Sequence, residues 1–405
     1  MKKQIFVIFI TVFIYLLGFG MIIPVLPILS THYGATPFQV GLLMSVFSLM
    51  QFLFSPFWGK LSDKFGRRPI LIYCLLGEAI SYLILASAKS LEMLFVARVL
   101  TGFFGASIST ASAYMSDITT AESRTKGMAL IGAAFGLGFL FGPAIGGGLT
   151  VLAKNFTTDQ SVILTFAAYP VAILCFLTFI FAYFFLEESR HRKPIAESKK
   201  TLQQFKNIFK FMHTPVLSQL MYLFGTTTLS MALMEATLVL FMKDRFDWGL
   251  KEVSFGFAYI GICIVFTQGF LVRKLVPKFG EKHIIRFGLF FMFIGFLLIC
   301  FANSVATMAV AMTFLSVGNA FTNSSTLGSI SLLSSDDDQG VILGTTQSLS
   351  ALGRVIGPAL GTLLYGSISQ ITPFALASLF ILINILIISK YFLQLPVSGR
   401  KSTSS

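Results

Sequence analysis

Four ionisable side chains lie inside stretches of the chain that are otherwise almost wholly apolar. They are Glu78, Arg98, Glu235 and Arg354. Charged groups are costly away from water, so those found there are functional candidates by default. Glu235 is the most informative, because a carboxylate in an apolar cavity can take up and release a proton. Glu78 and Arg98 could instead form a purely structural ion pair, and Glu235 could be a buried residue bonded to a neighbouring helix.

Polar residues also recur at helical spacing along the apolar stretches. These stripes contain Gln51 in one stretch, Thr228 beside Glu235 in a second, Asn319 and Asn323 in a third, and Gln347 beside Arg354 in a fourth. Residues three or four apart share one face of a helix. We expect these faces to line a cavity for a small-molecule substrate, while hydrogen bonds between helices would also explain each stripe alone.

The sequence lacks the residue patterns of metal, nucleophilic and ATP-driven chemistry. It contains no HExxH, no CxxC and no GxxxxGK[ST], and its four cysteines all fall in apolar stretches. We therefore expect no metal, no cofactor and no catalytic residues, which argues against an enzyme and an ATP-driven pump. A channel, or a membrane sensor without transport activity, is a further alternative.

The elements that must position these residues are membrane spans. Of the 405 residues, 55% are hydrophobic and only 12% charged, against about 25% charged in soluble domains. A segment of about 20 apolar residues crosses a bilayer as a helix. The apolar stretches are 5–29, 39–58, 70–88, 91–115, 127–150, 161–186, 215–242, 252–272, 284–302, 305–330, 341–366 and 371–393. Because backbone groups in lipid must be paired within each segment, we expect an all-α membrane protein of twelve helices.

The basic residues indicate which side of the membrane each loop occupies. The net charge is +13, and 23 of the 30 lysines and arginines lie in the loops, or at the ends of the stretches next to them, on the side shared by both termini. By the positive-inside rule both termini are cytoplasmic, and the basic excess indicates membrane topology rather than nucleic-acid binding. The MKK start and short loops favour a bacterial inner membrane.

Two pairs of matching segments indicate an internal repeat. LSDKFGRR (61–68) matches LVPKFGEK (275–282), and LGFLFGPAIG (137–146) matches LGRVIGPALG (352–361), at offsets of 214 and 215. An even number of spans separates the copies, so the repeats are parallel and suggest two bundles around a central site. The expected parts are a bundle at 1–186, a linker with an amphipathic helix at 187–214, a second bundle at 215–393 and a tail at 394–405.

Several motifs resemble those of one transporter family. GKLSDKFGRRPILI (59–72) is similar to the loop signature of the major facilitator superfamily, and RVLTGFFGA (98–106) to a fourth-span motif of its proton-driven members. GLGFLFGPAIGG (136–147) resembles the fifth-span antiporter motif, and GFGMIIPVLP (18–27) the first-span motif of twelve-span drug:proton antiporters. The chain thus resembles the tetracycline-efflux and multidrug branch.

The resemblance implies a major facilitator fold that exports a small amphipathic compound in exchange for protons by alternating access, as a monomer. It implies a proton-coupling role for Arg98, beside the candidates Glu235 and Glu78. A facilitator or proton-coupled carrier of a sugar, organic acid or lipid is the alternative.

Charged residues of the loop signature, together with two at the end of the fourth span and in the loop after it, are expected to form a gate. The expected members are Asp63, Arg67, Arg68, Asp117 and Arg124. We expect the ion pairs among them to hold one transport state and to break when the cytoplasmic side opens.

Glycines are expected to shape the loop and to allow close helix packing. Gly59 and Gly66 should form the tight turn after the second span. The antiporter motif contributes Gly138, Gly142, Pro143 and Gly146, whose four-residue spacing lets another helix approach closely. The resemblance implies that this stripe packs where the two halves meet.

Overall fold

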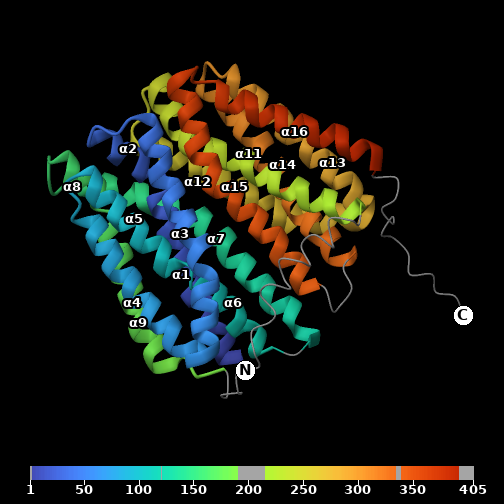
Figure 1. Cartoon of the computed structure of the whole chain (residues 1–405). Coiled ribbons are helices and arrows are strands. Elements are labelled where there is room, and N and C mark those ends of the chain that lie inside the picture. The colour runs from blue at the N-terminus through green and yellow to red at the C-terminus, as the bar shows by residue number, and fades with distance from the viewer. Residues whose placement is uncertain (1, 120, 190–214, 334–338, 392–405) are drawn as a thin grey trace, which may run out of the picture. The chain divides into compact units, whose positions relative to one another are not determined.

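The computed structural model describes residues 2–119, 121–189, 215–333 and 339–391, and all regular elements in those ranges are helices (Figure 1). In chain order they are α1 (Lys2–Ile22), α2 (Val25–His32), α3 (Pro37–Phe65), α4 (Arg67–Ala86), α5 (Leu91–Gly105), α6 (Ile108–Asp117), α7 (Ala121–Ala153), α8 (Gln160–Thr165), α9 (Ala168–Phe185), α11 (Pro215–Phe246), α12 (Leu250–Phe266), the π-helix η1 (Thr267–Val272), α13 (Arg273–Cys300), α14 (Val305–Leu333), α15 (Gln339–Ser367) and α16 (Thr372–Tyr391). The amphipathic helix expected in the linker lies outside the described residues.

Each of the twelve expected stretches is helical, which confirms the all-α membrane fold. Within the described ranges, nine segments are long and apolar enough to cross a membrane. One of them, Leu250–Cys300, has 51 residues, more than twice the about 20 that one crossing needs. Gly280, with φ 78°, interrupts the helical backbone inside it and separates two spans.

Three stretches expected as single spans are each two helices. The pairs are α1 with α2, α5 with α6, and α8 with α9. Pro24 lies directly before α2, and a proline has no amide hydrogen with which to continue the preceding helix. Gly105 ends α5, and glycine is a poor residue for a helix interior.

Side-chain caps set the amino ends of two spans. At the start of α3, Thr36 Oγ1 accepts a hydrogen bond from the Gln39 amide at 3.3 Å, and the Thr36 amide donates to Gln39 Oε1 at 2.9 Å. This reciprocal pair is a capping box, and Pro37 follows at a position where its missing amide hydrogen costs nothing. Ser90 caps α5 by accepting from the Met93 amide.

The chain packs as two compact units. The first contains residues 1–196 and 236–261, and the second contains residues 197–235 and 262–405. The part of α11 from Ala236 onward belongs to the first unit because it packs there: Ala236 lies in the same apolar cluster as Met21, and Lys243 Nζ lies 3.4 Å from Thr31 Oγ1. The division into two six-helix bundles stays a prediction.

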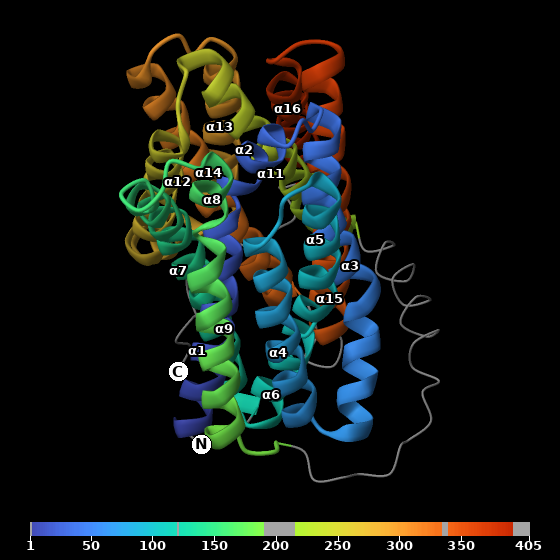
Figure 2. The same ribbon diagram turned by 90° about the vertical axis from the view of Figure 1, so that its left-hand side faces the viewer.

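The core of the first unit forms around α1, α4, α7 and α9. Helix α9 lies beside both α1 and α4 (Figure 2), and α7 lies along α1. Val7, Ile8, Met21 and Leu26 of the first helices are at most 2% exposed, because neighbouring helices cover them. This packing brings the end of α9 to the ends of α4 and α6.

Candidate functional site

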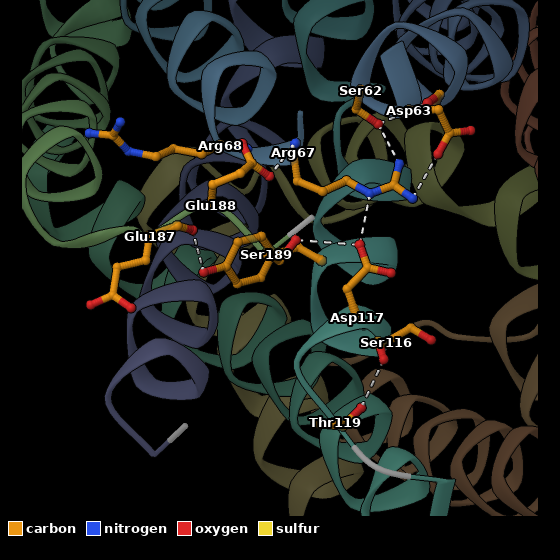
Figure 3. Close-up of polar contacts among 12 residues, drawn as sticks. Ser62, Asp63, Arg67, Arg68, Ser116, Asp117, Thr119, Glu187, Glu188 and Ser189 are labelled. Atoms are coloured by element: carbon orange, nitrogen blue, oxygen red, sulfur yellow. Dashed lines mark hydrogen bonds and ion pairs between the residues drawn. The ribbon is translucent and has the colours of Figure 1, made fainter. Parts of the chain in front are cut away.

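Arg67 is the centre of a polar cluster in the first unit, where the ends of α3, α4 and α6 meet the chain leaving α9 (Figure 3). The arginine is only 8% exposed. Its Nη2 lies 2.9 Å from Asp63 Oδ1, and its Nε lies 3.1 Å from Asp117 Oδ2. Nη1 donates to Ser62 Oγ at 2.6 Å. The structure therefore brings together three of the residues expected in the gate.

The cluster ties separate elements together through one buried cation. Asp63 belongs to the last turn of α3, Arg67 to the first turn of α4, and Asp117 to the last turn of α6. A buried charge that loses a partner is strongly destabilised. The ion pairs of Arg67 can therefore persist only while the three helix ends stay together, and they are lost when these ends separate.

A glycine turn and a distant glutamate shape the start of α4. Gly66 has φ 102°, a conformation that other residues rarely adopt, and it both ends α3 and precedes α4. Having no side chain, Gly66 cannot cap α4. The Glu188 carboxylate does so instead: Oε1 accepts from the Arg67 amide at 2.9 Å and Oε2 from the Arg68 amide at 3.2 Å. A carboxylate at a helix amino end is favourable both as an acceptor and as a negative charge.

Sequence reasoning missed the residues that follow α9. Besides Glu188, the Ser189 hydroxyl donates to Asp117 Oδ2 at 3.3 Å. The Tyr114 hydroxyl of α6 donates to the carbonyl of Glu187 at 2.8 Å, which fixes the same segment. The signal was present: two adjacent glutamates directly follow the sixth span in an otherwise strongly basic segment.

Of the other two residues expected in the gate, Arg68 does not join the cluster, and the side chain of Arg124 is not described. The Arg68 side chain points away from Arg67 (Figure 3) and donates from Nη2 to the Tyr183 carbonyl at 2.6 Å. Its guanidinium carbon lies 5.8 Å from the centre of the Tyr183 ring. Arg124 is part of α7, but its side chain lies outside the described part of the chain.

One glycine, and not two, makes the turn between α3 and α4, and the second sequence repeat has a glycine with positive φ at the same position. Gly59 lies within α3 with open space around it, so the expectation that it shares the turn is wrong. Gly280, at the offset of 214 from Gly66, has φ 78°. The position equivalent to Asp63 holds Pro277, and that equivalent to Arg67 holds Glu281, so the second copy keeps the turn without the acid–base pair.

The glycines of the antiporter motif pack against the first span. A Cβ added at Gly142 would lie 2.7 Å from backbone atoms of Gly20, and one at Gly146 would lie 2.5 Å from the carbonyl oxygen of Met21. Gly138 likewise has α1 backbone within 2.8 Å of its Cβ position. The three glycines thus face α1, while Gly147 of the same motif faces Ser254 of α12. The expectation that the motif packs where the two halves meet stays a prediction. Only glycine lets the two backbones approach this closely.

Glycines of the second unit allow the same close packing of two helices. A Cβ at Gly353 would lie 3.0 Å from the Leu229 amide nitrogen, and one at Gly357 would lie 2.9 Å from the carbonyl carbon of Ala232. Gly361 is equally close to Leu233. Helix α15 therefore packs on α11 as α7 packs on α1, in agreement with the sequence repeat.

Glu78 and Arg98 are both deeply buried but do not form the structural ion pair that was the alternative to a functional role. Each is 2% exposed. The Arg98 guanidinium lies 4.3 Å from the centre of the Phe47 ring, and its Nε lies 3.5 Å from the Leu43 carbonyl, so it is directed toward α3. Among the described residues Glu78 makes no ion pair, and its Oε2 has no hydrogen-bond partner.

The residues expected to line a substrate cavity fall in both units. Gln51 belongs to the first unit, and its Nε2 donates to the Tyr15 hydroxyl oxygen and, at 3.3 Å, to the Gly105 carbonyl. The members in the second unit, with Glu235 beside them, are Thr228 on α11, Asn319 and Asn323 on α14, and Gln347 and Arg354 on α15. Gln347 is exposed and the others are half-buried. A single cavity containing all of them stays a prediction.

Two short-range contacts orient side chains of this set. Arg354 Nη1 donates to Ser350 Oγ at 2.9 Å, one turn earlier on α15. Thr228 Oγ1 donates to the Phe224 carbonyl at 2.8 Å. The threonine hydroxyl keeps its lone pairs for another donor, since only its hydrogen is used.

Comparison with known proteins gives a consistent result along the whole chain. The family model described as Major Facilitator Superfamily matches residues 8–278 and 269–405. The class H tetracycline resistance protein of Pasteurella multocida is 31% identical over 372 residues, 90% of each chain. Multidrug resistance protein 2 of Bacillus subtilis is 28% identical over 373 residues, 90% of this chain and 89% of that protein.

Solved structures agree on the fold. A crystal structure of a human organic anion transporter covers 96% of this chain and 99% of its own with a TM-score of 0.71 at 24% identity. A bacterial homologue of the human lysosomal transporter Spinster, in an inward-facing and occupied conformation, covers 99% of this chain and 98% of its own with a TM-score of 0.76 at 12% identity.

Proposed function

This chain belongs to the Major Facilitator Superfamily, and on that premise we propose that it exports a small amphipathic, tetracycline-like compound in exchange for protons. It is an integral membrane transporter and not an enzyme. The observation that carries the proposal is the similarity, over 90% of the chain, to a tetracycline resistance protein. A role in antibiotic resistance is part of the same proposal.

The Arg67 cluster supports alternating access as the mechanism. Its members lie on the side of the basic loops, which the charge bias assigns to the cytoplasm together with both termini of the chain. In this mechanism the ion pairs of Arg67 with Asp63 and Asp117 hold the helix ends together in one transport state. They rearrange as the cytoplasmic side opens and closes.

Buried ionisable residues supply the proposed coupling to protons. Glu235 is half-buried beside Thr228 on α11, where proton binding and substrate binding would compete. Glu78 and Arg98 provide a second acid and a buried cation in the other unit. An acid that is protonated in one state and ionised in the other converts a proton gradient into directed transport.

Transport by the purified protein in proteoliposomes tests this function. Vesicles with an acidic interior are supplied with tetracycline and with cationic, neutral and anionic drugs from outside. Because exported compounds exchange against protons, we expect at least one amphipathic compound to accumulate against its gradient, and a protonophore to abolish the accumulation. Vesicles prepared without the protein are the control.

The competing function gives a different result in the same vesicles. A facilitator of sugars, organic acids or lipids would equilibrate its substrate without accumulation, and no drug would move against its gradient. A symporter would accumulate substrate only when the pH gradient is reversed. Either outcome would overturn the export mechanism while leaving the family unchanged.

A further inference from the structure

Asn384 is a buried amide in the middle of an apolar span. It is the one polar residue between Leu379 and Ile388 on α16, and it is 1% exposed. Both polar atoms of its side chain meet Thr226 of α11: Nδ2 donates to Thr226 Oγ1 at 2.8 Å, and Oδ1 lies 3.0 Å from the same oxygen. A buried polar group is costly unless it is hydrogen-bonded. The amide therefore favours the arrangement in which α11 presents Thr226 to α16.

The bond between Thr226 and Asn384 marks one face of α11. Ser230, one turn further along, is fully buried, and its hydroxyl lies 3.5 Å from the Ala377 carbonyl oxygen of α16. Helix α15 covers a second face through the three glycines described above. Glycine brings two helix backbones close together, but it offers no side chain that would fix their rotation. The bond to Asn384 supplies a directional contact that does so.

The face of α11 that contains Glu235 lies on the other side of the helix. At about 100° per residue, Glu235 is turned by about 180° from Thr226 around the helix axis. Thr228 and Met231 share that side with Glu235, and all three are half-buried, whereas every other residue from 230 to 242 is buried. A helix turns as one body, so the contact that holds Thr226 also sets the direction of Glu235.

We propose that Asn384 is a positioning residue, whose bond to Thr226 fixes the rotation of α11 and so presents the face of Glu235 to the substrate. For its role in transport this inference rests on the proposed function, because Thr228 and Glu235 are expected to lie along the substrate path. Asn384 acts only through α11 and touches neither the substrate nor the proton. Loss of its amide turns the coupling carboxylate away without changing that carboxylate.

Asn384→Leu breaks the bond without leaving a polar group unpaired. Leucine has nearly the shape of asparagine, and the Thr226 hydroxyl keeps a hydrogen bond within its own helix, to the Tyr222 carbonyl at 2.9 Å. A lost partner is costly chiefly when it leaves the other group unsatisfied, so this variant should fold. Thr227→Val is the matched control, because the buried Thr227 hydroxyl donates within α11, to the Leu223 carbonyl at 2.8 Å.

Hydroxyl-radical footprinting of the purified full-length protein measures the rotation without any transport step. Mass spectrometry gives the oxidation rate of Met231, which is half-buried beside Glu235, relative to that of Met234, which is 5% exposed. We expect this ratio to exceed one in the wild type, in Thr227→Val and in Thr226→Ser, which keeps the hydroxyl. It should fall toward one in Asn384→Leu, because a helix that is free to turn averages the two exposures.

Two footprints would overturn the inference: a wild-type ratio that does not exceed one, or a ratio in Asn384→Leu equal to that of the wild type. If Asn384→Leu does not fold, Asn384→Ala removes the amide without adding bulk and is read in the same way. Denaturation in detergent identifies which variants fold.

Proteoliposomes then separate the two proposals. Slower uphill export by Asn384→Leu, with export by Thr227→Val unchanged, supports the positioning role. A wild type without proton-driven export contradicts the proposed function alone, since the footprint still reports the rotation. Uphill export by Asn384→Leu at the wild-type rate, despite a changed footprint, contradicts the role of Asn384 in transport alone.

Discussion

The close approach of α7 to α1 makes Gly142 a sharp test of the packing. The Cβ of alanine at this position would lie 2.7 Å from two backbone atoms of Gly20, where ordinary contacts begin at 3.4 Å. The helices must therefore separate by about 0.7 Å, and overpacking of this kind costs about 1–3 kcal/mol. Alanine recovers up to about 1 kcal/mol of that through its better helix propensity. The expected net loss of stability for Gly142→Ala is about 1 kcal/mol.

Gly148 on the same helix provides a matched control, because no atom outside its local helix lies within 4 Å of its Cβ position. Gly148→Ala should be neutral or slightly stabilising, so the two variants differ by the overpacking cost alone. Denaturation of the purified proteins in detergent measures stability, and proteoliposome export with a proton-leak assay measures coupling. If Gly142→Ala is as stable as Gly148→Ala, then α7 does not pack on α1 at this glycine.

Three further outcomes are expected. Glu188→Gln keeps the shape of the side chain but removes the negative charge at the amino end of α4, so the free energy of unfolding should fall by about 1 kcal/mol. Glu187→Gln is the control: the Glu187 carboxylate points away from the cluster (Figure 3), so its loss should not change the denaturation temperature. Asp117→Asn should shift the balance of open and closed states more than Asp63→Asn, because the side chain of Asp63 is 52% exposed and that of Asp117 only 30%, and exposed ion pairs contribute only about 0.2–1 kcal/mol. Cysteine crosslinking across the helix ends at this cluster would contradict this by giving the reverse order. Glu235→Gln should abolish uphill export and spare downhill exchange in proteoliposomes, and accumulation with wild-type pH dependence would remove Glu235 from the coupling mechanism.

The span pattern and the turn could be read from the sequence because each depends on local chemistry. A stretch of about 20 apolar residues can satisfy its backbone in lipid only as a helix, and α3, α14 and α15 formed where such stretches lie. The offset between repeats located Gly280 as the partner of Gly66, and both have positive φ. The spacing of Asp63 and Arg67, four residues apart, is likewise a local property, and the two side chains pair.

Tertiary packing decided the contacts between residues far apart in the sequence. The bond between the Arg67 amide and Glu188 joins residues 121 positions apart, and no periodicity along one helix reports such a contact. Arg98 is directed to the Phe47 ring and not to Glu78, because the position of a residue along its helix does not fix the rotation of that helix about its axis. The sequence thus determined the helices, their membrane character and the family, while the Arg67 cluster with its Glu188 cap, the contact of the three glycines with α1 and the surroundings of Glu78 were determined by how those helices rotate and approach one another.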